Sequence, residues 1–170
     1  MDIYNLLVQE ISDNEKRRRK SYSGWDSESD IRNFEIFKKW KEKNKGHDIV
    51  WKGIFKNRLI WIEWFTDGKI VIFNIHATIP WYEYKDYRIG WSKFYTRSKW
   101  INPELTDIDD DFQDSGLGKV LYKAILRWCK DHDFYGIKSD PIKQVDRTKM
   151  LYKSLGGYID ENGMATLEAK

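Results

Sequence analysis

The 170-residue sequence has a single cysteine, Cys129, so neither an intrachain disulfide nor a CxxC zinc module can form. Proline and glycine are also scarce, at 3 and 11 residues, which argues against a collagen-like or low-complexity chain. No apolar run approaches the roughly 20 residues that span a bilayer. The first residues lack a basic stretch followed by an apolar one, the pattern of a secretory signal. We therefore expect a cytoplasmic protein that does not contact membranes.

An excess of charge of one sign is also missing. The sequence has 30 lysines and arginines against 27 acidic residues, a net charge of +3. Such a small balance does not by itself indicate a nucleic-acid partner. Aromatic residues, in contrast, are plentiful at 16%, and 9 of them are tryptophans. Hydrophobic residues make up 41%, enough to bury a core. We therefore predict a single domain over residues 1–170.

Two parts are predicted along the chain, a helical part over residues 1–46 and a core with a sheet over residues 47–170. Apolar side chains at helical spacing predict helices over residues 2–20 and about 29–45. β-Branched and aromatic residues then predict a three-stranded antiparallel meander with tight turns. Its strands are expected at residues 49–55, 59–65 and 69–75. The second carries apolar residues on both faces, which predicts a central position in the sheet.

Residues 79–100 show no clear period, and we assign them no element. They combine aromatic side chains with interleaved cations, which are Lys85, Arg88, Lys93, Arg97 and Lys99. The C-terminal part is clearer, because its apolar periodicity changes in step with turn residues. It predicts a helix over residues 116–131, a strand over 134–139, a helix over 145–155 and a closing hairpin over 158–168.

A turn with two glycines opens the predicted helix at residue 116. A strand ending near Ile108 runs into this turn, where the N–H groups of the first helical turn are unsatisfied and point outward. Gly116 and Gly118 would let the backbone approach a phosphate closely. The pattern is neither a P-loop nor a full dinucleotide fingerprint. Two interpretations therefore stay open: a pyrophosphate site, and a tight strand-to-helix turn without a ligand.

Two motifs in this region carry a family resemblance. The run Gln113-Asp114-Ser115-Gly116-Leu117-Gly118 resembles the Gln/Arg-x-x-Gly-x-Gly/Ala motif of the GNAT family of N-acetyltransferases. Downstream, Leu151-Tyr152-Lys153-Ser154-Leu155-Gly156-Gly157-Tyr158 resembles the family's Leu-Tyr-x-x-Leu-Gly-Phe signature. The resemblance covers about residues 104–168. It implies an α/β fold of the GNAT type, in which a mixed, mostly antiparallel central sheet carries helices on both faces.

The resemblance also implies an activity and a site. The expected reaction is acyl transfer from acetyl-coenzyme A, as co-substrate, to a primary amine of a small molecule or of a protein lysine. Tyr152 matches the family's general acid, although a packed core tyrosine explains that position as well. For the general base the sequence offers Glu63 or Asp107, without a motif behind either. The implied coenzyme-binding residues are Ile108, Gln113, Asp114, Ser115, Gly116, Leu117, Gly118 and Lys119.

Other polar clusters receive simpler interpretations. Asp107, Asp109 and Asp111 have the first spacings of a calcium loop, but Phe112 and Gly118 occupy its sixth and twelfth positions. We therefore predict no metal site and interpret the acidic run as a solvated loop. The three histidines are widely spaced and show no ligand pattern. Cys129 is expected to be a small buried side chain.

An alternative function remains at this point. The chain could be a non-catalytic, acetyltransferase-like binding protein, of the kind that a phage encodes as an effector, that docks on a host protein or nucleic acid. Residues 81–100 would form the docking surface, because aromatic rings can stack on bases while cations contact phosphates. The same residues would select the acceptor in an acetyltransferase.

Overall fold

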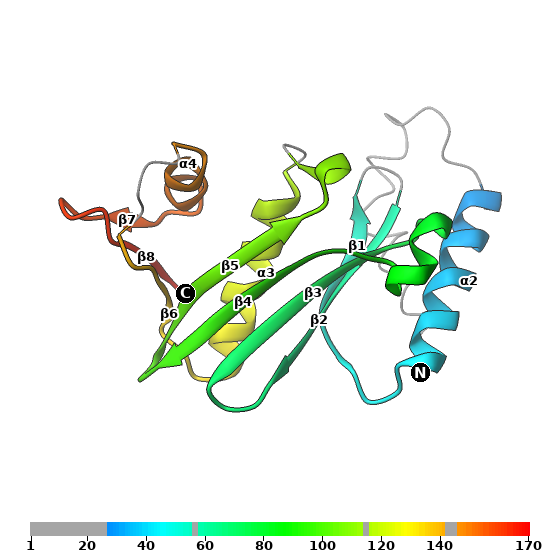
Figure 1. Ribbon diagram of the computed structural model, residues 1–170, viewed down its shortest axis with the longest axis horizontal. Helices are drawn as coiled ribbons and strands as arrows, with labels where there is room; N and C mark the ends of the chain where they lie inside the picture. The colour runs from blue at the N-terminus through cyan, green and yellow to red at the C-terminus, as the bar shows by residue number, and fades with distance from the viewer. Residues whose placement is uncertain (1–26, 56–57, 114–115, 142–145) are drawn as a thin grey trace.

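The computed structural model describes residues 27–55, 58–113, 116–141 and 146–170. The helix predicted at residues 2–20 lies outside them. Within the described residues, eight strands form one sheet in the order β1-β2-β3-β4-β5-β6-β8-β7 (Figure 1). Neighbouring strands are antiparallel except for β5 and β6, which are parallel. The predicted mixed, mostly antiparallel sheet is confirmed.

The first half of the sheet is the predicted meander of β1 (Asp48–Phe55), β2 (Arg58–Thr66) and β3 (Ile70–Ala77). Local chemistry fixes the turn between β2 and β3. The Asp67 carboxylate accepts the N–H groups of Lys69 and Ile70, each at 2.9 Å, and Gly68 has a φ of 92°. β2 lies between β1 and β3 and is covered on both sides, as its apolar residues predicted.

The unassigned segment forms a 3₁₀ turn, η1 (Pro80–Lys85), and a long strand, β4 (Arg88–Arg97). β5 (Trp100–Ile108) follows after a tight turn in which Ser98 has a φ of 56°. β4 does alternate in burial: Ile89 and Phe94 are fully buried, whereas Trp91 is only half-buried and Tyr95 is exposed. Aromatic residues on both faces, and a register shift between Lys93 and Phe94, hide this alternation in the sequence.

Helices cover both faces of the sheet, as predicted. α3 (Leu117–Asp131) packs on one face, where Leu121, Ile125 and Trp128 join Ile60 and Ile62 in the main core. It lies behind β4 and β5 in the view of Figure 1. α2 (Ser27–Lys43) packs on the other face, where Phe37 and Trp40 join Trp61 in a smaller core. Successive β2 side chains therefore serve opposite cores, as a strand with a side-chain period of two requires.

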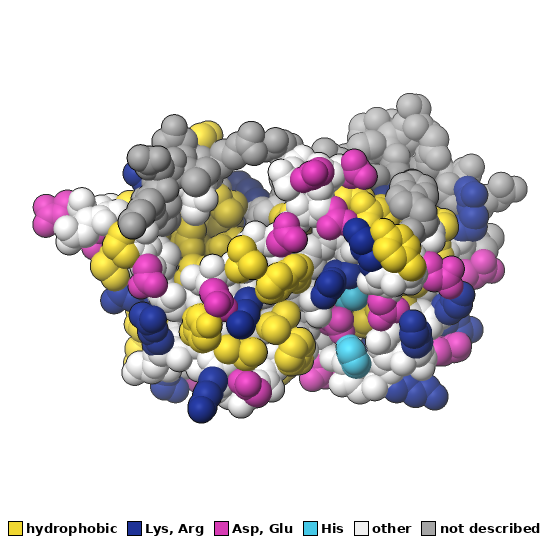
Figure 2. All heavy atoms as spheres, viewed as in Figure 1, with side chains coloured by type: hydrophobic (Ala, Val, Ile, Leu, Met, Phe, Trp, Pro, Cys, Tyr) yellow, Lys and Arg dark blue, Asp and Glu magenta, His cyan; other side chains and the backbone are white. Residues whose placement is uncertain are grey.

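α2 leaves part of its face of the sheet uncovered. Phe65, Tyr95 and Leu105 are 51%, 37% and 50% exposed. Figure 2 shows hydrophobic side chains gathered over β3, β4 and β5, with cations and carboxylates between them.

None of the helices among the described residues is long and apolar enough to cross a membrane.

The C-terminal elements are β6 (Gly136–Lys138), α4 (Asp146–Ser154), β7 (Tyr158–Ile159) and β8 (Ala165–Glu168). They occur in the predicted order, although the strand expected over 134–139 is shorter. The predicted hairpin joins β7 to β8, and the Asp160 carboxylate accepts the N–H groups of Asn162 and Met164 in its turn. Gly136 is required where β6 meets β8, since a Cβ there would lie 1.9 Å from the Leu167 carbonyl oxygen.

Candidate functional site

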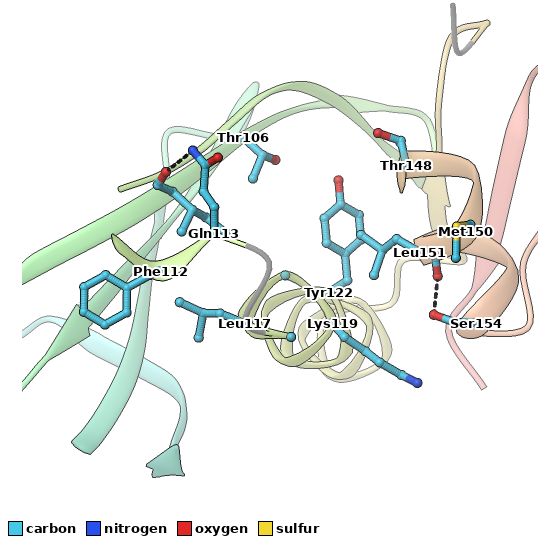
Figure 3. Close-up of a pocket in the computed structure, with 13 residues that line it drawn as sticks. Thr106, Phe112, Gln113, Leu117, Lys119, Tyr122, Thr148, Met150, Leu151 and Ser154 are labelled. Carbon is cyan, nitrogen blue, oxygen red and sulfur yellow. Dashed lines mark hydrogen bonds between the residues drawn. The ribbon is translucent and has the colours of Figure 1, made fainter. Parts of the chain in front are cut away.

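A pocket opens where the two parallel strands part. β5 and β6 pair only at Trp100–Gly136 and Ile101–Ile137, after which β6 ends while β5 continues to Ile108. At the point of separation, the Asn102 side-chain amide donates to the Lys138 carbonyl at 2.7 Å. The resulting cavity has a volume of about 650 Å³ and lies between β5, the start of α3 and α4 (Figure 3). It is lined by Thr106, Ile108, Phe112, Gln113, Gly116, Leu117, Gly118, Lys119, Tyr122, Thr148, Met150, Leu151 and Ser154.

The N-terminus of α3 faces this pocket. Gly116 precedes the helix with a φ of 88°, and the first helical N–H groups have no acceptor within the helix. Helix-dipole charge and the Lys119 side chain favour an anion here, and the first turn contains no acidic residue. Nothing lies within 4 Å of the position that a Cβ on Gly118 would occupy, so the helix surface is open there. This end of the pocket suits a phosphate group.

Gln113 ties the loop before α3 back to the end of β5. Its side-chain amide nitrogen donates to the Ile108 carbonyl at 2.9 Å and to the Asp110 carboxylate at 3.1 Å. The glutamine therefore positions the strand end and the turn relative to each other. Of the eight coenzyme-binding residues implied by the resemblance, the pocket brings together six, whereas Asp114 and Ser115 lie outside the described residues. The coenzyme-binding roles of all eight residues stay predictions.

The two tyrosines of this region differ in their access to the pocket. Tyr152 is only 1% exposed and does not line the cavity, whereas Tyr122 of α3 does. Their ring centroids lie 5.7 Å apart. Figure 3 shows the Tyr122 hydroxyl pointing into the space between Thr106 and Thr148. Tyr122 is therefore the phenol within reach of a pocket ligand, whereas Tyr152 does not line the cavity.

Other hydroxyl groups lie close to this pair of tyrosines. Burial, and then the contact with Tyr122, raises the pKa of the Tyr152 phenol. Burial also raises the pKa of Tyr122, while the neighbouring hydroxyls of Thr106 and Tyr152 partly oppose that rise. The Thr106 hydroxyl in turn lies 2.6 Å from the Ser92 hydroxyl. Both phenols are therefore protonated at neutral pH, as a proton donor must be.

Sequence reasoning missed Tyr122, although a signal for it was present. Tyr122 follows Gly118 by four residues, so the two share a face of α3. A glycine predicted to face a ligand therefore predicts that the side chain one turn later faces it too.

Neither candidate base opens into the pocket. Glu63 lies under α2, is 6% exposed, and contacts the ring nitrogens of His47 and His76, the latter at 2.8 Å. Burial raises the pKa of Glu63, but the hydrogen bonds and charges of His76 and His47 together outweigh it and leave this pKa lowered. Asp107 belongs to β5, between the two pocket-lining residues Thr106 and Ile108, so its side chain is on the opposite face of the strand.

Two carboxylates of the acidic run contact other side chains. Asp109 pairs with Lys85 at 3.3 Å, and Asp110 accepts from Gln113. Among the described residues, no group of three potential metal-ligating His, Cys, Asp or Glu side chains comes together. Two histidines also stack on tryptophans: the ring centroids of His76 and Trp61 lie 5.3 Å apart, and those of His132 and Trp128 lie 4.5 Å apart.

Most cations of residues 81–100 are already paired. Lys85, Lys93 and Arg97 lie 3.3, 3.0 and 3.7 Å from carboxylate oxygens of Asp109, Glu104 and Asp140. Tyr82, Tyr87 and Phe94 are buried and contribute to the cores, not to an exposed stacking surface. The predicted docking surface over residues 81–100 therefore has fewer unpaired cations and fewer exposed aromatic rings than the sequence indicates.

Comparison with known proteins supports the fold. No protein-family model matches the sequence, and no curated protein matches it. The cAMP-binding acyltransferase from Mycobacterium smegmatis matches with a TM-score of 0.54 at 9% identity, over 80% of this chain and 50% of that one. A single-residue mutant of it gives a TM-score of 0.56 at 7% identity, over 84% of this chain and 51% of that one. The chain thus spans about half the length of that protein.

A third similar structure is the ribosomal-protein-S18-alanine N-acetyltransferase from Escherichia coli, with a TM-score of 0.48 and 15% identity over 62% of this chain and 72% of that one. The superposition on the cAMP-binding acyltransferase establishes a likeness of fold, and at 7–9% identity it establishes nothing finer. The fold of the chain resembles that of the GNAT acetyltransferases, as the motifs at residues 113–118 and 151–158 predicted.

Proposed function

We propose that the protein transfers an acyl group from acetyl-coenzyme A to a primary amine of a small molecule or of a protein lysine. The observation that carries this proposal is the pocket between the parted parallel strands, with Gly116, Gly118 and the start of α3 at one end. The first N–H groups of α3 and Lys119 would hold the pyrophosphate. The pantetheine arm would follow the edge of β5 that β6 leaves unpaired, toward Tyr122.

The reaction needs no covalent enzyme intermediate. The neutral amine attacks the thioester carbonyl, a C–N bond forms, the C–S bond breaks, and the coenzyme leaves as its thiolate. The nitrogen loses one proton to water as the amide forms, and the thiolate gains one proton from a side chain. A backbone N–H near Ile108 would stabilise the developing oxyanion. We assign the protonation of the thiolate to Tyr122, because its hydroxyl lines the pocket, and the positioning of Tyr122 to Tyr152. This assignment differs from the family resemblance, which gives the role of general acid to Tyr152.

The test compares Tyr122→Phe with Tyr152→Phe, using release of free thiol from acetyl-coenzyme A in the presence of a panel of primary amines. Both changes keep the ring and remove one hydroxyl. Tyr122→Phe should lower kcat by ~10²–10⁴, the contribution of a positioned acid, while leaving the affinity for coenzyme A unchanged. Tyr152→Phe should have the smaller effect. A larger loss for Tyr152→Phe, at equal stability, would return the acid role to Tyr152.

One observation favours the second candidate, a non-catalytic binding protein with this fold. Neither Glu63 nor Asp107, the carboxylates considered as general base, lines the pocket. Such a protein would retain the pocket and form no acylated amine. Mass spectrometry of the amine panel after incubation separates the two candidates: an acylated amine formed at rates above those without protein contradicts the second.

A further inference from the structure

A second hollow continues from the pocket along the outer surface of α3. It shares Lys119 and Ser154 with the pocket, has a volume of about 660 Å³, and runs between α3, the end of α4 and the end of β8. Leu126 and Leu155 contribute its apolar surface. We call this hollow the α3 groove. Its polar lining is Lys119, Lys123, Arg127, Lys130, Asp131, Ser154, Glu168 and Lys170.

Cations follow one side of α3 along this groove. Lys119, Lys123, Arg127 and Lys130 recur every three or four residues and are all exposed, so they form one row on the helix. At 1.5 Å per residue the row is about 16 Å long. Within the described part of the chain, none of the four lies within ion-pair distance of a carboxylate. Asp131 and Glu168 line the groove as well but do not neutralise the row.

The opposite face of the molecule provides the contrast. There Lys39 pairs with Glu83, Lys43 with Asp86 at 3.4 Å, and Lys93 with Glu104 at 3.0 Å. Figure 2 shows dark blue and magenta side chains interspersed over that face. These three cations each have a carboxylate partner, whereas the four cations of the α3 row have none among the described residues. Pairing, which sequence alone does not reveal, separates the two groups of cations.

We propose that the α3 groove binds the phosphodiester backbone of a single-stranded nucleic acid. A row of unpaired, regularly spaced cations in a concave surface suits an equally regular row of phosphates. No aromatic side chain lines the groove, so base stacking is not available there. Binding should therefore depend on phosphate contacts, with strong salt dependence and little sequence preference.

The proposal moves the nucleic-acid surface from residues 81–100 to α3, and it does not depend on acyl transfer. Lys119 is shared with the pocket and would also contact a coenzyme phosphate. Lys123, Arg127 and Lys130 line only the groove, so they allow the two ligands to be tested separately.

The experiment uses the full chain carrying Lys123→Gln, Arg127→Gln and Lys130→Gln together, because glutamine resembles lysine and arginine in helix propensity. The matched control carries Lys39→Gln, Lys43→Gln and Lys93→Gln, which removes the same charge from the opposite face. Fluorescence anisotropy follows binding of a short labelled single-stranded DNA of mixed sequence over a series of salt concentrations. Circular dichroism and Tm show that each variant is folded.

The groove variant should bind at least about tenfold more weakly at low salt. Its slope of log K against log salt should flatten by about 0.7 for each lost contact, or about 2 in total. The control should bind as the parent does, and both variants should keep the parent's affinity for coenzyme A. Failure of the parent to bind DNA, or an equal loss in the control, would overturn the proposal. So would stronger competition by polyglutamate than by unlabelled DNA, which would indicate an acidic protein partner.

Discussion

Gly118 offers a substitution whose effects on stability and on coenzyme binding should have opposite signs. The residue lies in the first turn of α3 and lines the pocket, and a Cβ there meets nothing within 4 Å. A side chain is therefore accommodated without strain. Gly116 lacks this advantage, because its φ of 88° disfavours any other residue and would confound binding with folding.

Two variants separate bulk from charge. Gly118→Ala should stabilise the fold by about 0.5–1 kcal/mol, the propensity difference between glycine and alanine inside a helix. Gly118→Glu should keep much of that gain, since a carboxylate in the first helical turn adds about 0.3–1 kcal/mol through the helix dipole. Both variants should thus unfold at or above the parent's Tm in the absence of ligand.

Coenzyme binding should respond in the opposite direction. A carboxylate about 5 Å from a phosphate charge costs about 3 kcal/mol at an effective dielectric constant near 20. That energy corresponds to an affinity loss of roughly a hundredfold. Calorimetric titration with acetyl-coenzyme A measures it, with Gly118→Ala as the control for added bulk. Unchanged affinity in a folded Gly118→Glu variant would refute the assignment of the pyrophosphate to the start of α3.

Further predictions concern Glu63 and Cys129. Glu63→Ala should lower the free energy of unfolding by about 3 kcal/mol, because it leaves His76 buried without its carboxylate partner. A free energy of unfolding within 1 kcal/mol of the parent's value would contradict this prediction. The lowered pKa of Glu63 means that its contribution is complete above the unfolded-state pKa of about 4.3 and is lost as the pH falls toward the folded-state value. The difference between parent and variant in urea titrations should therefore shrink below about pH 4. Burial raises the pKa of Cys129 to about 12, so a thiol reagent should modify it only in the unfolded protein; rapid labelling under native conditions would show that α3 detaches from the sheet.

The fold could be predicted from the sequence to the extent that local signals determine it. Neighbouring residues alone determine the turn at Asp67-Gly68 and the two motifs around α3 and α4. The meander and the C-terminal elements were therefore predicted in the right order. β4 escaped prediction because its aromatic residues lie on both faces. The positions of α2 and α3 on the sheet could not be predicted, because they depend on packing between residues that are distant in the sequence.

The site was predicted less completely, for the same reason. The glycines at 116 and 118 predicted which backbone would face the pocket, but access of a side chain depends on how α3 and α4 pack. That packing buries Tyr152 and exposes Tyr122 to the cavity. Ion pairs between distant residues, such as Lys39 with Glu83, likewise decide which cations remain available. Only tertiary structure brings such partners together.

The measurement that tests the central claim most directly is a thermal-shift titration of the parent protein with acetyl-coenzyme A. A ligand that binds only the folded state stabilises it by about 2.7 kcal/mol at a hundredfold excess over Kd. For a chain of this size that stabilisation raises Tm by roughly 5–10 °C. Our account predicts such a saturable rise, and its loss in Gly118→Glu. An unchanged Tm at millimolar acetyl-coenzyme A would contradict the account, because the pocket would then not bind the proposed acyl donor.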